Sequence, residues 1–170
     1  EHAVAERIAK EDPLPDAVTI VGDVIYDHGE AENYDSRFFH PYRSILPAIP
    51  FLAAVGNHDY ETAQAAPLLA VFTLPRNGPS GVGPENLYWF ERAGVLTIVH
   101  NTCLSTSTLR DVAVPWHASV ARRAAVFRLA VLHHPPYSSG PNAKDPPTPA
   151  IKALFPPVFT SSGIDLALSG

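Results

Sequence analysis

Three stretches of the sequence place metal-binding types of side chain directly after a run of apolar residues. They are VGD at 21–23, VGNHD at 55–59 and VLHHPPYSSG at 131–140. Together with Tyr26 they offer carboxylate, amide, imidazole and phenol donors, which suit a hard or borderline cation better than a soft one. A carboxylate such as Asp23 can bridge two cations about 3.5–4 Å apart, and such a pair can hold a phosphoryl group and activate water. Turn chemistry alone explains one strand end of this kind, but three together favour a shared site.

The apolar runs before these stretches are typical of strands that are buried on both faces. Residues 17–21, 51–55 and 127–132 are rich in Val, Leu, Ile and Ala, as expected for a parallel sheet. Ligands of open α/β sheets collect at the carboxyl ends of the strands. The polar side chains that follow the three runs are therefore expected to converge at one edge of a sheet.

The rest of the chain alternates helical and extended patterns, which predicts an α/β fold. The predicted helices are 2–10, 33–46, 62–72 with an interruption at Pro67, 114–125 and 151–155. The further strands form a hairpin at 86–101, joined at Ala93 and Gly94, and a last strand at 164–170. Many of the 18 prolines lie between 135 and 157, which predicts long, stiff loops at one end of the sheet.

Composition limits the classes of protein to consider. The chain has 170 residues, of which 46% are hydrophobic, enough for one sizeable core and hence a single domain. Its net charge of -5, with both signs interspersed, disfavours nucleic acid and anionic membranes as partners. Cys103 is the only cysteine, so an internal disulfide or a cysteine-rich zinc site is excluded. No apolar run reaches the roughly 18 to 20 residues that span a bilayer, and the start at Glu1 without any methionine indicates a fragment.

These motifs resemble those of the calcineurin-like metallophosphoesterases, and specifically the purple acid phosphatase branch. GDVIY at 22–26, GNHD at 56–59 and the first His of HHPPYSSG carry the resemblance, with further likeness at 29–60 and 87–101. It implies an α/β/β/α sandwich of two sheets covered by helices, incomplete at both ends. It also implies an acid phosphatase-like monoesterase that acts on a small phosphorylated substrate with two metal ions. These would be Fe(III) together with Fe(II), Zn(II) or Mn(II), in a secreted or periplasmic protein.

The resemblance assigns roles to individual residues. Asp23 would bridge the two metals, and Tyr26 would bind the ferric ion as a phenolate. Asn57 and His133 would bind the second metal. His58 would contact the phosphate and assist proton transfer to the leaving group.

Neighbouring residues receive other interpretations. The substrate side of the site would consist of Asn57, His58 and His134. Asp59 is expected to cap the following helix or to orient His58, because Asp is favoured at helix starts. The remaining candidates are interpreted as ordinary histidines without partners at ligand spacing (His28, His40, His100 and His117) and as core aromatic residues (Tyr88 and Trp89).

The sequence also departs from the family pattern. The family has an earlier strand that ends in an Asp-containing motif, and nothing before Ala17 matches it. The family also has a Gly-His-X-His motif, whereas this sequence stops at Gly170 after ALSG. Four of the seven expected ligands are therefore present, and the chain by itself is expected to bind metal poorly and to be inactive. A nucleotide phosphodiesterase of the same superfamily and a non-catalytic binding or scaffold domain remain the alternatives.

Overall fold

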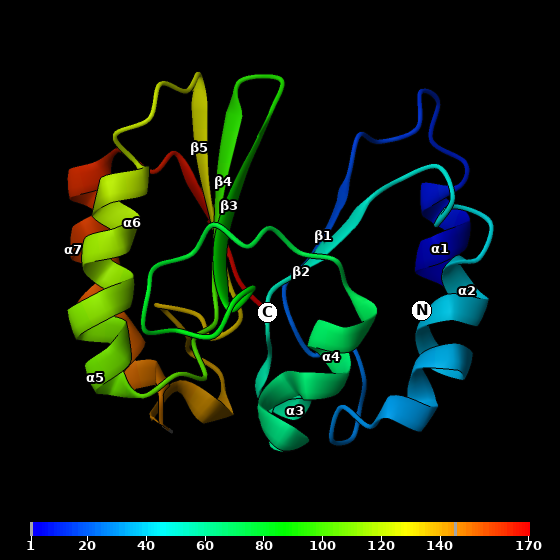
Figure 1. The fold of residues 1–170 in the computed structure, drawn as a ribbon, viewed down its shortest axis with the longest axis horizontal. Coiled ribbons are helices and arrows are strands. Elements are labelled where there is room, and N and C mark those ends of the chain that lie inside the picture. Colours follow the sequence, from blue (N-terminus) through cyan, green and yellow to red (C-terminus); the bar gives the residue numbers. More distant parts are fainter. Residues whose placement is uncertain (1, 145) are drawn as a thin grey trace.

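The structure, a computed structural model that describes residues 2–144 and 146–170, contains two sheets with helices beside each (Figure 1). The strands are β1 (Val18–Ile20), β2 (Phe51–Ala53), β3 (Leu87–Arg92), β4 (Val95–His100), β5 (Phe127–Leu132) and β6 (Leu166–Leu168). The α-helices are α1 (His2–Ile8), α2 (His40–Tyr42), α3 (Asn57–Glu61), α4 (Ala66–Val71), α5 (Thr106–Thr108), α6 (Val114–Val120) and α7 (Thr148–Ser162). Helices α1 and α2 lie beside the small sheet, and α5, α6 and α7 cover the outer face of the large one. This arrangement confirms the predicted two-sheet α/β fold.

The small sheet pairs β1 and β2 in parallel, with Val18 opposite Phe51 and Ile20 opposite Ala53. The large sheet has the order β3-β4-β5-β6. Its first pair is antiparallel, and the others are parallel. Ala93 and Gly94 join β3 to β4 with φ angles of 50° and 80°, as in the two-residue turns that match strand twist. The predicted hairpin is thus confirmed.

Several of the predicted helices differ in extent from the sequence pattern, among them the helix predicted at 151–155, which is part of the longer α7. The segment predicted as one helix at 33–46 consists of a 3-10 turn at Ala31–Asn33, a π-helical turn at Asp35–Phe39 and α2. The helix predicted at 114–125 begins earlier, at Thr106, passes through a π-helical turn at Leu109–Ala113 and ends at Val120. Further 3-10 turns lie at Ala63–Ala65 and Pro141–Lys144.

The prediction of stiff loops between 135 and 157 is wrong for its second half, because α7 runs through it. Pro156 and Pro157 lie inside this helix, although each lacks the amide that a helix interior uses. Ile151 and Phe155 on the same helix are completely buried in a core cluster. Burial of this apolar face stabilises the helix against the unfavourable propensity of its prolines.

The large sheet separates two hydrophobic cores, since side chains alternate along each strand. Ile98 of β4 and Leu132 of β5 belong to the core shared with α6 and α7. Val99 and Val131, one residue away along the same strands, belong to the core between the two sheets. The face that a strand residue occupies therefore decides which core it enters.

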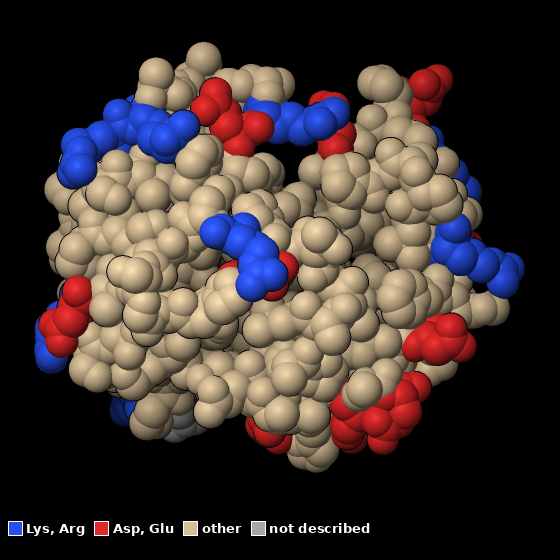
Figure 2. Space-filling view, viewed as in Figure 1, with Lys and Arg blue, Asp and Glu red and all other residues tan. Residues whose placement is uncertain are grey.

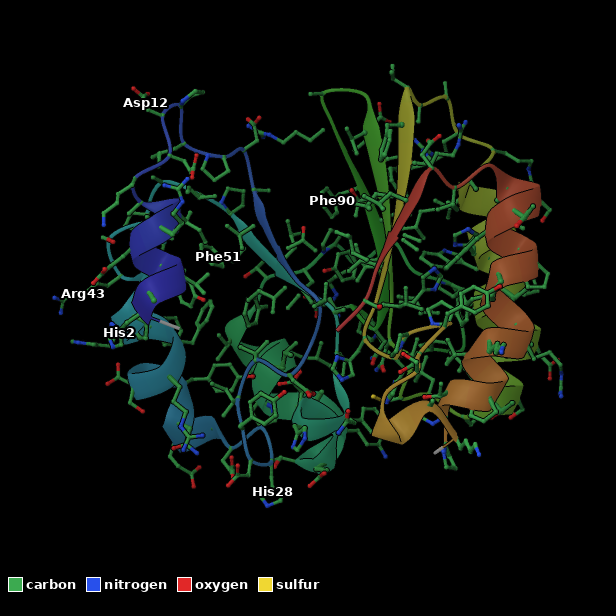
Figure 3. The ribbon with its side chains drawn as sticks, turned by 180° about the vertical axis from the view of Figure 1, so that it is seen from behind. His2, Asp12, His28, Arg43, Phe51 and Phe90 are labelled. Carbon is green, nitrogen blue, oxygen red and sulfur yellow. The ribbon has the colours of Figure 1, made fainter. Side chains whose placement is uncertain are left out.

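Side chains of both sheets fill the space between them (Figure 3). Phe51 of β2 and Phe90 of β3 pack into this core. Tyr88 is 1% exposed, and its hydroxyl donates to the carbonyl oxygen of Ala53 at 2.9 Å, which links the two sheets. The prediction that Tyr88 and Trp89 are core residues is confirmed for Tyr88, whereas Trp89 is half-buried against the second core.

Charged side chains on the face shown in Figure 2 occur in small groups of either sign, separated by neutral surface. None of the helices in 2–144 and 146–170 is both long enough and apolar enough to cross a bilayer.

Candidate metal and phosphate site

The candidate site is built where the loops after β1, β2 and β5 come together. Gly22 follows β1 with a φ of 98°, a conformation that favours glycine. A β-carbon on Gly22 would lie 2.7 Å from Nδ1 of His133 and 2.9 Å from the α-carbon of Gly56. A β-carbon on Gly56 would collide with the carboxylate of Asp23. The two glycines therefore permit the close approach of the three loops.

Asp23 and His133 form the centre of this arrangement. Oδ2 of Asp23 lies 3.4 Å from Nε2 of His133, and both side chains are nearly buried. His133 Nε2 lies 3.0 Å from Oδ1 of Asn57, and its Nδ1 donates to the carbonyl oxygen of Val21 at 2.9 Å. The Val21 carbonyl thus orients the ring so that Nε2 faces the Asp23 and Asn57 oxygens.

The pairing shifts the titration of both groups. Burial alone raises the pKa of Asp23, but hydrogen bonds and the charge of His133 outweigh it, so the pKa is lowered. Burial alone lowers the pKa of His133, but hydrogen bonds to Asp23 and Val21 outweigh it, so this pKa is raised. The arrangement therefore favours the ionised carboxylate that a bridging metal ligand requires.

Tyr26 and His58 lie beside Asp23. The hydroxyl of Tyr26 donates to Oδ2 of Asp23 at 3.0 Å, and the backbone amide of His58 donates to Oδ1 at 3.0 Å. The rings of Tyr26 and His58 are 4.6 Å apart at their centroids. The imidazole of His58 also contacts the carbonyl oxygen of Asp27. The Tyr26 hydroxyl and the His58 amide thus bind the two oxygens of the carboxylate.

Asp59 holds two of the loops together instead of facing the site. Its Oδ2 accepts from the amide of Gly56 at 3.0 Å, which caps α3. Its Oδ1 accepts from the amides of Val24 and Ile25 at 3.0 and 3.3 Å. The side chain is 1% exposed, and burial raises its pKa. Asp59 thus caps the start of the helix that contains it, not the following helix as expected, and the tie to the loop after β1 is an addition.

His134 takes part through a residue that the sequence motifs did not include. Its Nδ1 lies 2.8 Å from the hydroxyl of Thr102, and its backbone amide donates to the same hydroxyl at 3.2 Å. Burial lowers the pKa of His134 to about 4. Thr102 follows β4 at the same edge as the other loops, so the rule used for the other strand ends identifies it.

One cavity of about 360 Å³ brings the predicted site residues together. Its lining includes all six of them: Asp23, Tyr26, Asn57, His58, His133 and His134. Thr148, the first residue of α7, lines the same cavity and was not predicted from the sequence. Its position depends on where α7 begins, three residues before the helix predicted at 151–155.

The donor set suits a hard or borderline cation in type, because it combines carboxylate, phenol and amide oxygens with one imidazole nitrogen. The number of donors, however, is small. In the described part of the chain, no group of three His, Cys, Asp or Glu side chains is placed to hold a metal ion. Among the four candidate donors, Asp23 and His133 are of these types, and Tyr26 and Asn57 complete the set.

Comparison with known proteins then gives the family. A family model for calcineurin-like phosphoesterases matches residues 2–170. The chain belongs to the calcineurin-like phosphoesterase family. Members of this family are usually metal-dependent hydrolases of phosphate esters and typically bind two metal ions. No curated protein matches the sequence significantly.

Three other histidines of this calcineurin-like phosphoesterase form side-chain contacts outside the cavity. His28 lies 2.5 Å from Oε2 of Glu61 on the surface. His100 and His117, which the sequence presents as ordinary histidines without partners at ligand spacing, form a pair: Nε2 of His100 lies 2.9 Å from Nδ1 of His117 inside the second core. The sequence missed this pair because its members are on different elements, β4 and α6.

Proposed function

We propose that this calcineurin-like phosphoesterase is an acid phosphatase-like phosphomonoesterase of the purple acid phosphatase branch. The supporting observation is the single cavity at the carboxyl ends of β1, β2 and β5. It holds the four donors that the resemblance implies for two metals and the two histidines implied for the phosphate. A scaffold domain would have no need to place these six side chains around one hollow.

The residues that would hold the cations are Asp23, Tyr26, Asn57 and His133. When bound, two cations supply Lewis-acid polarisation of the phosphoryl oxygens and lower the pKa of a water from about 15.7 toward about 7. Asn57 and His134 face the space in which the phosphoryl group would lie. His58, which borders Asp23, would donate a proton to the leaving oxygen.

The proposal is tested with protein expressed from its complete reading frame and loaded with iron and zinc. Hydrolysis of an aryl phosphate should fall by about 100-fold or more in Asp23→Asn, by analogy with losses at metal sites. His58→Ala should impair turnover more than metal content, which separates proton transfer from metal binding. Metal-independent hydrolysis, or full activity of Asp23→Asn, would contradict the proposal.

Tyr26 identifies the branch and the metal. As a ferric phenolate it should give the iron-loaded protein a charge-transfer band in the visible, and Tyr26→Phe should abolish this band. Tyr60→Phe, a nearby tyrosine outside the donor set, is the matched control and should keep the band. A colourless, fully active enzyme free of iron would instead place the protein among the general phosphoesterases.

The limited donor count leads to a separate proposal for residues 1–170 on their own. Four donors do not enclose two cations, so this polypeptide should bind Zn(II) or Mn(II) weakly and hydrolyse aryl phosphates negligibly. Calorimetric titration of each metal into the purified 170-residue chain tests this. Tight binding of two equivalents would show that other residues of the chain supply ligands.

A further inference from the structure

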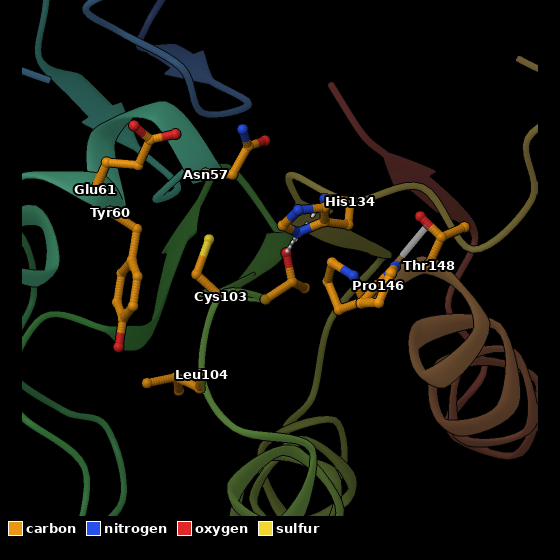
Figure 4. A pocket seen from close by; sticks show the side chains of 10 residues that line it. Asn57, Tyr60, Glu61, Cys103, Leu104, His134, Pro146 and Thr148 are labelled. Atoms are coloured by element: carbon orange, nitrogen blue, oxygen red, sulfur yellow. Dashed lines mark hydrogen bonds between the residues drawn. The ribbon is translucent and has the colours of Figure 1, made fainter. Parts of the chain in front are cut away.

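A second cavity, of about 520 Å³, adjoins the candidate metal and phosphate site (Figure 4). The two cavities share Asn57, His134 and Thr148 in their linings. The volume falls within the range of about 300–1,000 Å³ that is typical of small-molecule pockets. A molecule whose phosphoryl group occupied the first cavity could therefore extend into the second.

The shared wall between the two cavities is polar. It carries the amide of Asn57, the imidazole of His134 and the hydroxyl of Thr148. Thr148 is only 7% exposed, and it lines both cavities. An oxygen atom of a ligand at this junction could accept a hydrogen bond from its hydroxyl.

The wall of the second cavity beyond this junction is largely apolar. Tyr60 and Leu104 lie on one side and Pro146 on the other, with Cys103 between them (Figure 4). Burial raises the pKa of the Cys103 thiol to about 12, so it is a neutral part of this wall. Aromatic and aliphatic side chains of this kind favour an apolar group as the occupant.

The charges around the second cavity further restrict the class of ligand that it can bind. Among the described residues, no Lys or Arg lines either cavity, and Glu61 is the one charged residue that lines the second. Glu61 is also paired with His28 at 2.5 Å. A leaving group with its own phosphate or carboxylate would thus meet a carboxylate and no cation, which is unfavourable.

We infer that the second cavity is the leaving-group subsite, and that the preferred substrates are phosphate monoesters of uncharged aromatic alcohols. The inference rests on the proposed phosphomonoesterase function. In the reaction, the oxygen of water forms a bond to phosphorus and the ester P–O bond breaks. The alcohol that leaves into the second cavity takes up one proton, and inorganic phosphate is the other product.

The test uses the metal-loaded protein and three phosphonates that it cannot hydrolyse. By calorimetry, phenylphosphonate should bind at least about tenfold more tightly than methylphosphonate, since burial of a ring is worth that much or more. Carboxymethylphosphonate should bind no more tightly than methylphosphonate because of Glu61. Tyr60→Ala should reduce the phenyl-to-methyl ratio several-fold, and Tyr60→Phe should restore it.

Tyr137→Ala is the matched control, because Tyr137 is 69% exposed and lies outside the second cavity. It should leave the ratio at the value of the unmodified protein. If Tyr60→Ala does not fold, the test uses the unmodified protein instead. The amide chemical shifts of Tyr60, Cys103 and Leu104 are then measured by NMR. They should move with phenylphosphonate and stay still with methylphosphonate.

The outcomes separate the two proposals. If methylphosphonate binds and phenylphosphonate binds no better, the subsite is wrong while the proposed function stands. If tighter binding of carboxymethylphosphonate is found, the charge argument and hence the substrate class are overturned. If none of the three phosphonates binds, the proposed function fails, and the subsite fails with it.

Discussion

Two histidines at the ends of neighbouring strands have opposite surroundings. His100 is the last residue of β4 and lies opposite Leu132 of β5, and His133 is the residue after Leu132. His133 faces the cavity with Asp23, whereas His100 faces the core behind the sheet and is completely buried. A difference of one residue in register, not residue type, therefore separates a candidate metal ligand from a core histidine.

The two regions also differ in how completely their polar groups are hydrogen-bonded. Around the site, His133 uses both ring nitrogens, and the carboxylate of Asp59 accepts from three amides. In the core pair, Nδ1 of His100 and Nε2 of His117 have no hydrogen-bond partner among residues 2–144 and 146–170. Since either tautomer of the pair leaves one buried N–H unpaired, the site region is the better satisfied of the two.

The largest effect is expected for Asp59→Ala, which would leave the amides of Gly56, Val24 and Ile25 without their acceptor. Buried donors that lose a charged acceptor are costly, and the free energy of unfolding should fall by about 3–5 kcal/mol. Denaturant titration measures this change. Asp16→Ala is the matched control, since Asp16 is 72% exposed in its pair with Arg92, and its effect should stay below about 1 kcal/mol. A small loss for Asp59→Ala would show that the loops after β1 and β2 are held by other contacts.

The next effect tests the register argument directly through activity. In the metal-loaded full-length protein, His133→Ala should lower kcat/KM for an aryl phosphate by about 100-fold or more, because a metal ligand would be lost. The double variant His100→Leu/His117→Leu should stay within about threefold of the unmodified enzyme, since the pair lies behind the sheet. Comparable losses in both variants would mean that the two sides of the sheet are coupled in function.

The convergence of the loops was predictable from the sequence, but the different surroundings of His133 and His100 were not. Apolar runs that end in VGD, VGNHD and VLHH indicate strands whose ends meet, and the structure places the six side chains around one cavity. The run VLTIVH, which ends in His100, is nearly the same local signal. Its outcome depends on pairing with β5, which is a long-range property. The full length of α7 was missed for a related reason: the helix predicted at 151–155 lies inside it, but its prolines argue against a longer helix locally while its packing favours one.

The pH dependence of stability should come partly from the core pair. Burial lowers the pKa of His117 to about 4, and burial with repulsion from His117 lowers the pKa of His100 well below its usual value. A folded pKa below the unfolded value of about 6.5 means that the unfolded state binds the proton first. The contribution of these two histidines to stability is therefore fully present above pH 6.5 and is lost as the pH falls toward 4.

As the pH falls from 8 to 5, protonation of His117 in the unfolded state should by itself lower the free energy of unfolding by about 2 kcal/mol. Denaturation midpoints across this range measure the slope. The double variant His100→Leu/His117→Leu lacks both groups and should show a flatter profile than the unmodified protein over the same interval. An unchanged slope would assign the acid sensitivity to groups elsewhere.

The smallest effect is expected at pH 8 for the same double variant. Each single substitution leaves the other histidine with both ring nitrogens unpaired in an apolar core, and should cost about 1–3 kcal/mol. The double variant removes both polar groups together and replaces them with apolar side chains among Trp116, Phe155 and Phe159, which surround the pair. Since replacing both partners of a buried pair can be nearly neutral, its free energy of unfolding should change by less than about 1 kcal/mol. The coupling free energy between His100 and His117 follows from the unfolding free energies of the two single variants and the double variant in a double-mutant cycle. If the double variant instead lost as much as the two singles added together, the pair would not act as a unit, and the contrast with the hydrogen-bonded His133 and Asp59 would be wrong.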